Sequence, residues 1–263
     1  MDDRLLNYDS VEISFDGTPV VHDISFSLQS GEILGLVGES GSGKSTLMKA
    51  AMGLLGDNGL VTRGDITFRG RNLVDMPETE LRAVRGAEIG MIFQDAGASL
   101  CPIRTIGEQI YESMRAHRKI VRAEAKEHAL DLLAKLNFKE PERIWESYPF
   151  ELSGGMNQRA GIAISMLMNP PVLFADEPTS ALDVAVQRQV VQEMLRVREL
   201  FGTAIIIVTH DIGVVSAMAD TVLVLKDGRK MEYGPAEEIL EYPQNAYTKE
   251  LLSAVPKLRR SRN

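Results

Sequence analysis

The feature that most constrains the fold is a glycine-rich stretch between an apolar run and a helix-forming segment. Residues 38–45 read G-E-S-G-S-G-K-S and fit the pattern G-x-x-x-x-G-K-[ST] at every defined position. The apolar run I-L-G-L-V at 33–37 precedes the stretch, and T-L-M-K-A-A-M at 46–52 follows it. Glycines let a loop point its N–H groups at phosphate oxygens, and the helix dipole attracts the same anions. The sequence therefore predicts a buried strand, a phosphate-binding loop and a helix.

Within this loop the side chains predict a nucleotide site. Lys44 can reach the outer phosphates, and the Ser45 hydroxyl can bind Mg²⁺. The alternative is a glycine-rich turn that matches by chance, and both flanks argue against it. We expect the whole stretch to bind ATP, through Gly38, Glu39, Ser40, Gly41, Ser42, Gly43, Lys44, Ser45 and Thr46.

A second acidic element follows another apolar run, V-L-F-A at 172–175. Asp176 then lies at the carboxyl end of a strand, where ligands bind in open parallel sheets. Asp176 is a candidate Mg²⁺ ligand, and Glu177 can face a water that attacks the outer phosphate. Two adjacent acids are often only a solvated loop, but a phosphate loop in the same chain favours the metal and the base.

The rest of the chain alternates between strand and helix patterns. Short alternating runs fill residues 8–37, helical periodicity fills about 104–140, and strands and helices alternate again after N-P-P at 169–171. Such alternation predicts an α/β fold with a mostly parallel sheet between helices. We expect one domain over residues 1–263, with a core at 1–94 and 169–263 and an inserted helical subdomain at 95–168.

Composition excludes several kinds of protein. The formal net charge of −8 argues against nucleic-acid binding, and a single cysteine, Cys101, argues against a disulfide framework. The apolar runs are too short to span a membrane, and the acidic N-terminus lacks a signal-peptide core. We therefore expect a cytoplasmic protein that reaches the membrane only through a partner.

Further motifs carry a resemblance to a known family. L-S-G-G-M-N-Q at 152–158 is similar to the signature motif of the ATPase subunits of ABC transporters, and the chain resembles that family over essentially its whole length. The other motifs of the family match, in order, at Phe15, Gln94, Asp183 and His210. The resemblance implies an ABC-type phosphate-loop ATPase core with an N-terminal antiparallel β subdomain and an inserted helical subdomain.

The resemblance also implies the roles of these residues. Two ATPase subunits, identical or paralogous, would hold two ATP molecules head to tail, with Phe15 stacking on adenine. Gln94 would sense Mg²⁺ beside Ser45 and Asp176, and the catalytic residues would be Gln94, Glu177 and His210. The partner subunit would contact the same ATP through Ser153, Gly154, Gly155, Gln158 and Asp183. Asp183 can instead simply cap the helix that follows it.

A subgroup resemblance rests on three segments. I-F-Q-D at 92–95, A-L-D-V at 181–184 and A-Y-T-K-E-L-L at 246–252 look like the oligopeptide, dipeptide and nickel importers. Such an ATPase would act on two transmembrane permease subunits that are fed by a substrate-binding protein. The chain departs from the subgroup at Ala96-Gly97, Cys101 and Asn157, and we expect no iron–sulfur cluster. An exporter ATPase, a soluble ABC ATPase outside transport and a weakly hydrolysing partner domain remain alternatives.

Overall fold

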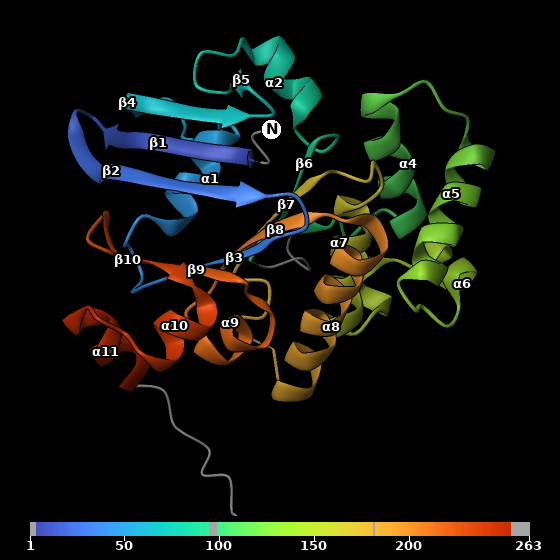
Figure 1. Cartoon of the computed structure of the whole chain (residues 1–263). Coiled ribbons are helices and arrows are strands. Elements are labelled where there is room, and N and C mark those ends of the chain that lie inside the picture. Colours follow the sequence, from blue (N-terminus) through green and yellow to red (C-terminus); the bar gives the residue numbers. More distant parts are fainter. Residues whose placement is uncertain (1–3, 95–98, 181, 254–263) are drawn as a thin grey trace, which may run out of the picture.

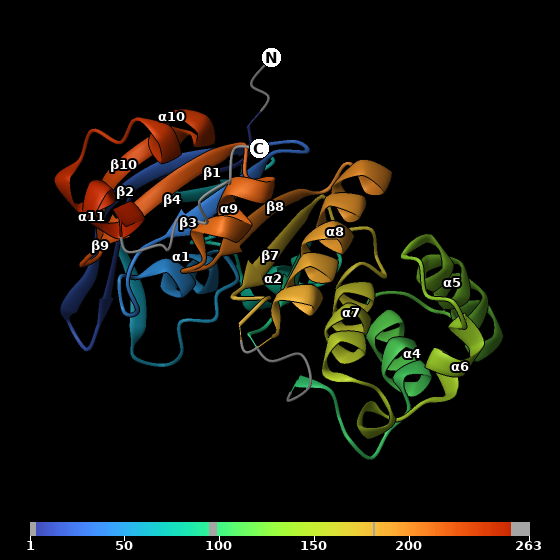
Figure 2. The same ribbon diagram turned by 90° about the horizontal axis from the view of Figure 1, so that it is seen from below.

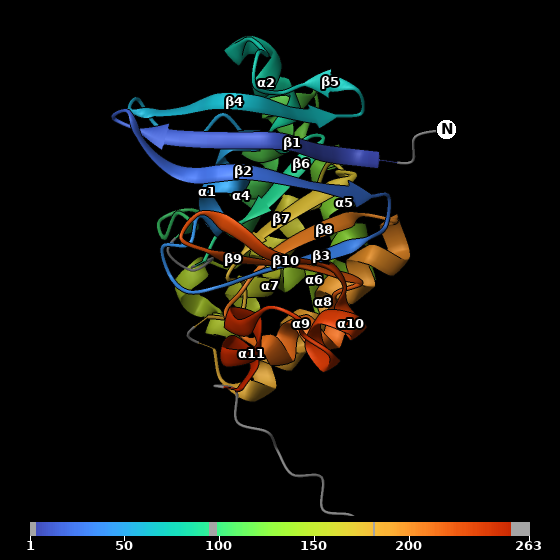
Figure 3. The same cartoon turned by 60° about the vertical axis from the view of Figure 1, so that its left-hand side comes forward.

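Two β-sheets lie one above the other in the computed structural model (Figure 1, Figure 3). The structure describes residues 4–94, 99–180 and 182–253. The first sheet is antiparallel and has the strand order β2-β1-β4-β5. Its strands are β1 Arg4–Phe15, β2 Thr18–Gln29, β4 Gly59–Phe68 and β5 Arg71–Asn72. Asp16 and Gly17, both at positive φ, close the turn between β1 and β2.

The second sheet has the order β10-β9-β3-β8-β7-β6 and is parallel except where β10 pairs with β9. Its strands are β3 Ile33–Val37, β6 Ile89–Ile92, β7 Val172–Asp176, β8 Ala204–Val208, β9 Thr221–Lys226 and β10 Arg229–Pro235. Asp227 and Gly228, at φ 47° and 69°, close the predicted β9–β10 hairpin. The predicted α/β fold with an antiparallel β subdomain is therefore confirmed.

The central strands are apolar at every position because both faces of the sheet are covered. All five residues of β3 and all five of β8 are buried. In β8, Ile206 packs into the core toward the first sheet, whereas Ile205 and Ile207 pack into the core toward the helices. The two-residue period of a strand thus distributes one apolar run between two cores.

Helices lie around and beside the two sheets (Figure 1, Figure 2). They are α1 Lys44–Ala51, α2 Glu78–Val84, α4 Ile106–His117, α5 Arg122–Lys135, α6 Pro141–Glu146, α7 Gly154–Ser165, α8 Val184–Phe201, α9 Ile212–Met218, α10 Ala236–Glu241 and α11 Ala246–Ser253, with a 3₁₀ turn at Pro149–Glu151. Among the described residues, none of these helices is long and apolar enough to cross a membrane.

Helices α4–α7 form a group beside the sheets (Figure 2). Thr105 and Glu108 form a reciprocal capping box that starts α4, and Trp145 of α6 is buried in the group. A side chain at Gly107 would approach the Trp145 ring to 2.5 Å, so α4 and α6 pack closely. The predicted helical periodicity is confirmed, whereas the subdomain limits at residues 95 and 168 remain a prediction. Ala96-Gly97 and the basic C-terminal stretch K-L-R-R-S-R-N at 257–263 lie outside the described residues.

A buried ion pair joins α7 to α8, which lie side by side (Figure 1, Figure 2). Arg159 Nη2 lies 2.7 Å from Glu193 Oε1, with only 18% and 10% of the two side chains exposed. Arg159 also donates to the Leu136 carbonyl at 2.7 Å and lies over the Phe138 ring. Burial raises the pKa of the Glu193 carboxyl, and the Arg159 charge, which acts to lower it, does not offset that effect. The ion pair therefore holds the two helices in register more than it adds net stability.

We predict that Arg159→Met lowers the free energy of unfolding by about 3 kcal/mol, because it leaves the Glu193 carboxylate buried without its partner. The double variant Arg159→Met, Glu193→Leu should recover at least half of that loss. Urea denaturation of the purified chain measures both values.

The matched control is Asp131→Ala, which breaks the exposed pair between Asp131 and Lys135. Its cost should stay below about 0.5 kcal/mol. Equal losses for Asp131→Ala and Arg159→Met would contradict a special role for the buried pair.

Candidate functional site

Four neighbouring strands bring the predicted motifs together at one edge of the second sheet. The phosphate loop follows β3, His210 follows β8, Asp176 ends β7 and Gln94 follows β6. Because these strands are parallel, their carboxyl ends meet at the same edge. They enclose a cleft of about 440 Å³ that is lined by Ser40, Gly41, Gly43, Lys44, Ser45, Thr46, Gln94, Asp176, Glu177 and His210.

Glycine is required at two positions of the phosphate loop. Gly38 has φ 150°, and a Cβ there would lie 2.1 Å from the Leu225 carbonyl oxygen of β9. Gly43 has φ 95° and immediately precedes α1. The first turn of α1 carries no acidic residue, so its free N–H groups and positive dipole end face the cleft unopposed. This end of α1 suits a phosphate group.

Lys44 is folded back into the loop. Its Nζ donates to the carbonyls of Gly38 at 2.9 Å and Glu39 at 2.6 Å, and to the Ser42 hydroxyl at 3.3 Å. Burial lowers the pKa of Lys44, while the negative charges of Glu177, Asp176 and Glu39 act to raise it. These three acceptors are neutral oxygens, which an incoming phosphate can replace with negatively charged ones.

Ser45 and Asp176 form the second contact of the cleft. The Ser45 hydroxyl donates to Asp176 Oδ1 at 2.7 Å. Burial raises the pKa of Asp176, and this hydrogen bond acts to lower it. A hydroxyl and a carboxylate oxygen are the hard donors that Mg²⁺ prefers, so these residues fit the ion. The described residues contain no group of three or more His, Cys, Asp and Glu side chains that could hold a metal ion. Phosphate oxygens would therefore have to supply further ligands to Mg²⁺.

Glu177 connects two other predicted residues. Gln94 Nε2 donates to its Oε2 at 3.3 Å, and His210 Nδ1 lies 3.3 Å from its Oε1. Glu177 has φ 46°, a conformation that costs a non-glycine residue free energy. Its backbone N–H donates to the Val208 carbonyl at 2.8 Å, which holds it in place at the end of β8. The carboxylate is thus fixed in the cleft opposite Lys44.

Several predicted residues lie outside this cleft lining. Phe15 ends β1, and its ring packs against the core of the first sheet. The ring lies so close to Gly59 that a Cβ at that position would be 2.7 Å from it. Asp183 accepts from the backbone N–H groups of Ala185 at 2.9 Å and Val186 at 3.0 Å, and so caps α8. The interpretation of Asp183 as a helix cap is confirmed, and its contact with ATP remains a prediction.

The residues of the signature motif, 152–158, also lie outside the lining of the cleft. Ser153 caps α7 by accepting from the Met156 N–H, and a side chain at Gly154 would meet open space. At Gly155, in contrast, a Cβ would lie 2.7 Å from Val186 of α8. Glycine is therefore needed at 155 for helix packing, while the N-terminus of α7 at 153–154 is open to a ligand.

The structure places Gln158 away from the open helix end at 153–154, and its contact with ATP remains a prediction. Its side chain is only 4% exposed, and its amide donates to the Pro178 carbonyl at 2.8 Å. Gln158 lies one helical turn after Gly154, and its side chain is held against the loop that follows β7. Asn157, which the sequence left without a role, donates to the Pro149 carbonyl at 2.9 Å and ties the 3₁₀ turn to α7.

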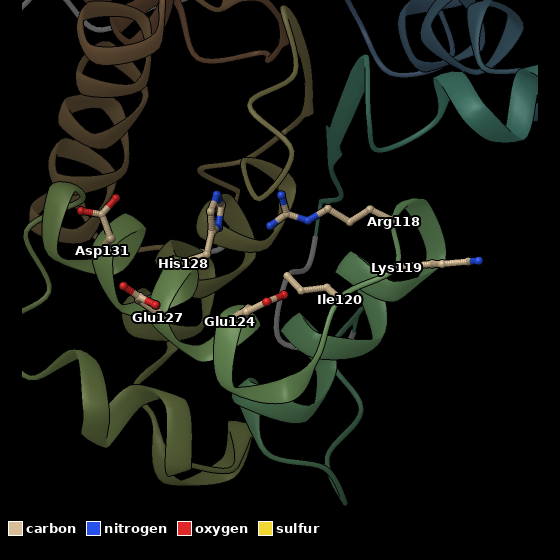
Figure 4. Close-up of a pocket in the computed structure, with 7 residues that line it drawn as sticks. All are labelled: Arg118, Lys119, Ile120, Glu124, Glu127, His128 and Asp131. Carbon is tan, nitrogen blue, oxygen red and sulfur yellow. The ribbon is translucent and has the colours of Figure 1, made fainter.

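A second hollow lies on the helical group, away from the cleft (Figure 4). It has a volume of about 420 Å³ and is lined by Arg118, Lys119, Ile120, Glu124, Glu127, His128 and Asp131. Its charges are of both signs and are mostly exposed, and no nucleophile is paired with a base there. This hollow is therefore not the candidate catalytic site.

Two contacts of the site were not predicted from the sequence. The Ser180 hydroxyl donates to the Gln94 carbonyl at 3.4 Å and links the loops that follow β6 and β7. The Tyr247 hydroxyl accepts from the Glu39 N–H at 3.1 Å. These pairs are 86 and 208 residues apart in the chain, and no sequence signal joined either pair.

Comparisons with protein families and with curated proteins both match this chain to ATP-binding proteins of ABC transporters. The family model described as ABC transporter matches residues 21–180. The oligopeptide transport ATP-binding protein OppD of Escherichia coli is 45% identical over 260 residues, which cover 97% of this chain and 77% of OppD. The dipeptide transport ATP-binding protein DppD of Lactococcus lactis is 41% identical over 97% of this chain and 74% of DppD.

Solved structures agree with this match. CbiO1 of Clostridium perfringens, part of the ABC transporter complex cbiONQ, superposes with a TM-score of 0.78 and 27% identity over 90% of this chain and 91% of cbiO1. The ATP-binding cassette MJ0796, a dimer bound to ADP and Pi in a post-hydrolysis state, superposes with a TM-score of 0.74 and 28% identity over 88% of this chain and 98% of MJ0796.

Proposed function

This chain belongs to the ABC transporter family of ATP-binding proteins, and from that premise we propose that it is the ATPase of a peptide importer. The observation that carries the proposal is the fixed placement of Glu177 between Gln94 and His210, opposite Lys44, in one cleft. The names of its relatives concern oligopeptide and dipeptide transport, so we propose peptides before nickel or metal chelates as cargo.

ATP would bind with its phosphates on the loop at 38–46. The N–H groups at the start of α1 would face the phosphates, and Lys44 would exchange its loop carbonyls for outer phosphate oxygens. Ser45 and Asp176 would hold Mg²⁺, whose chemistry is to offset negative charge on the phosphates. Phe15 lies outside the cleft lining, and we propose that it stacks on adenine at the rim beyond β1.

Hydrolysis needs a base on the far side of the outer phosphate. Glu177 accepts a proton from a water as its oxygen bonds to phosphorus, and the bond to the ADP oxygen breaks. Gln94 and His210 hold the two carboxylate oxygens from either side and so orient that base. His210 is exposed enough to reach the outer phosphate at the same time.

We predict that Glu177→Gln keeps ATP affinity within about threefold and lowers turnover by at least 100-fold, because the amide cannot accept the proton. Filter binding with labelled ATP and a phosphate-release assay give the two numbers. Turnover near that of the unaltered chain would refute the base assignment.

A second subunit would complete the site through the open end of α7. Ser153 and Gly154 lie at a capped helix N-terminus that has no phosphate loop beside it in its own chain. A head-to-tail dimer would place this end on the outer phosphate of the partner's ATP, with the α8 cap at Asp183 nearby. The dimeric assembly of MJ0796 supports this arrangement.

Ser153→Arg should block ATP-dependent dimerisation, because the bulk and charge of arginine fill the open helix end. ATP binding by the isolated chain should stay within about twofold of the unaltered value. Sedimentation of the Glu177→Gln background with and without Ser153→Arg tests dimerisation, and a dimer of unchanged stability would contradict the proposal.

A groove between the β6 end and the helical group is proposed to receive a permease subunit. It has a volume of about 360 Å³, and its lining includes the half-exposed Phe93 together with Leu100, Cys101, Ser113 and Ile164. Phe93 adjoins Gln94, so a helix seated here would touch the sequence neighbour of the residue that contacts Glu177. This contiguity would couple transport to hydrolysis.

Ser113→Trp should fill this groove and abolish copurification with the two membrane subunits, while basal ATPase activity stays within about twofold. Ala116→Trp, on an exposed position of the same helix, is the matched control and should copurify normally. Equal copurification of both variants would move the docking site elsewhere.

Importer, exporter and non-transport ATPases differ in what stimulates them. Stimulation of reconstituted ATPase activity by a peptide-loaded binding protein supports import. ATPase activity that neither membrane subunits nor a loaded binding protein changes would favour the soluble alternative.

A further inference from the structure

The C-terminal helix contacts the phosphate loop directly. Tyr247 of α11 is 7% exposed, and its Oη accepts a hydrogen bond from the Glu39 backbone N–H at 3.1 Å. Glu39 is the second residue of the loop, and α11 lies next to β10 beyond the hairpin (Figure 1). The contact therefore joins the far end of the chain to the site.

Several interactions hold Tyr247 in position. Asn245 Oδ1 accepts from the Tyr247 N–H at 2.8 Å and starts α11. The Glu232 carboxylate of β10 in turn accepts from the backbone N–H groups of Gln244 at 2.8 Å and Asn245 at 3.3 Å. The turn before α11 is thus fixed to the second sheet.

Side chains from the second sheet also hold the aromatic ring of Tyr247. Lys226 Nζ lies 4.5 Å from the ring centroid, and the ring packs in the apolar cluster that includes Val37, the last residue of β3. These contacts of the ring fix the position of the hydroxyl relative to Glu39.

Both backbone polar groups of Glu39 are therefore hydrogen-bonded. Its N–H is bound by Tyr247, and its carbonyl accepts from Lys44 Nζ at 2.6 Å. Because both bonds act on one residue, the hydroxyl restrains the part of the loop on which Lys44 rests before phosphate arrives.

We propose that Tyr247 is a positioning residue that holds the phosphate loop in its nucleotide-binding shape from the C-terminal helix. This inference rests on the proposed function of the loop in binding ATP. A loop that is already ordered loses less conformational entropy when phosphate binds.

Tyr247→Phe tests the proposal because it removes the hydroxyl and keeps the ring. The Kd for ATP should rise about fivefold, which corresponds to about 1 kcal/mol for one hydrogen bond. The kcat at saturating ATP should stay within about twofold, so the change should fall on KM. Backbone amide exchange at Glu39 in the nucleotide-free chain should become at least tenfold faster.

Tyr242→Phe is the matched control, since Tyr242 is 70% exposed and precedes the same helix. Its Kd and exchange rates should equal those of the unaltered chain. Unchanged ATP affinity and unchanged Glu39 exchange in Tyr247→Phe would overturn the proposal. Faster exchange throughout the core would also overturn it, because that result indicates general destabilisation. Failure of the unaltered chain to bind ATP would instead refute the proposed function.

Discussion

The parallel pairing of β3, β8 and β7 is the constraint on which the rest of the structure depends. Each pair is in regular register, and Asp176 pairs with Val208 at the end of its strand. This register lines up the carboxyl ends of the strands, from which the phosphate loop, the acids and His210 emerge. Burial on both faces leaves these strands no other register that keeps their side chains in the two cores.

Around that edge, the polar groups restrain one another through hydrogen bonds. Lys44 is held by loop oxygens, Ser45 by Asp176, and Glu177 by Gln94 and His210. Each bond is one that phosphate, Mg²⁺ or water can replace with a stronger or charged partner. Hydrogen bonds among its own residues thus shape the cleft, and a binding site that is held in shape lowers the cost of binding.

The helical group adds a second function to the same chain. Its α7 is joined to α8 by the Arg159–Glu193 pair and by the close packing of Gly155 on Val186. The open helix end at Ser153 consequently moves with the helix that Asp183 caps. The proposed head-to-tail dimer would bring this open helix end of one chain to the phosphate loop of the other, as the family resemblance implied.

By itself the sequence determined the α/β fold, the loop at 38–45 and the acids after β7. These features depend on local patterns, namely periodicity, glycine spacing and the residue that follows an apolar run. Only the tertiary structure decided the contacts of Gln158, Gly155, Arg159 and Tyr247, because each depends on a partner from another element. Helical spacing alone does not show that Gln158 faces Pro178. Likewise, no local pattern places Tyr247 against Glu39, because β9, β10 and the turn before α11 determine where its hydroxyl ends.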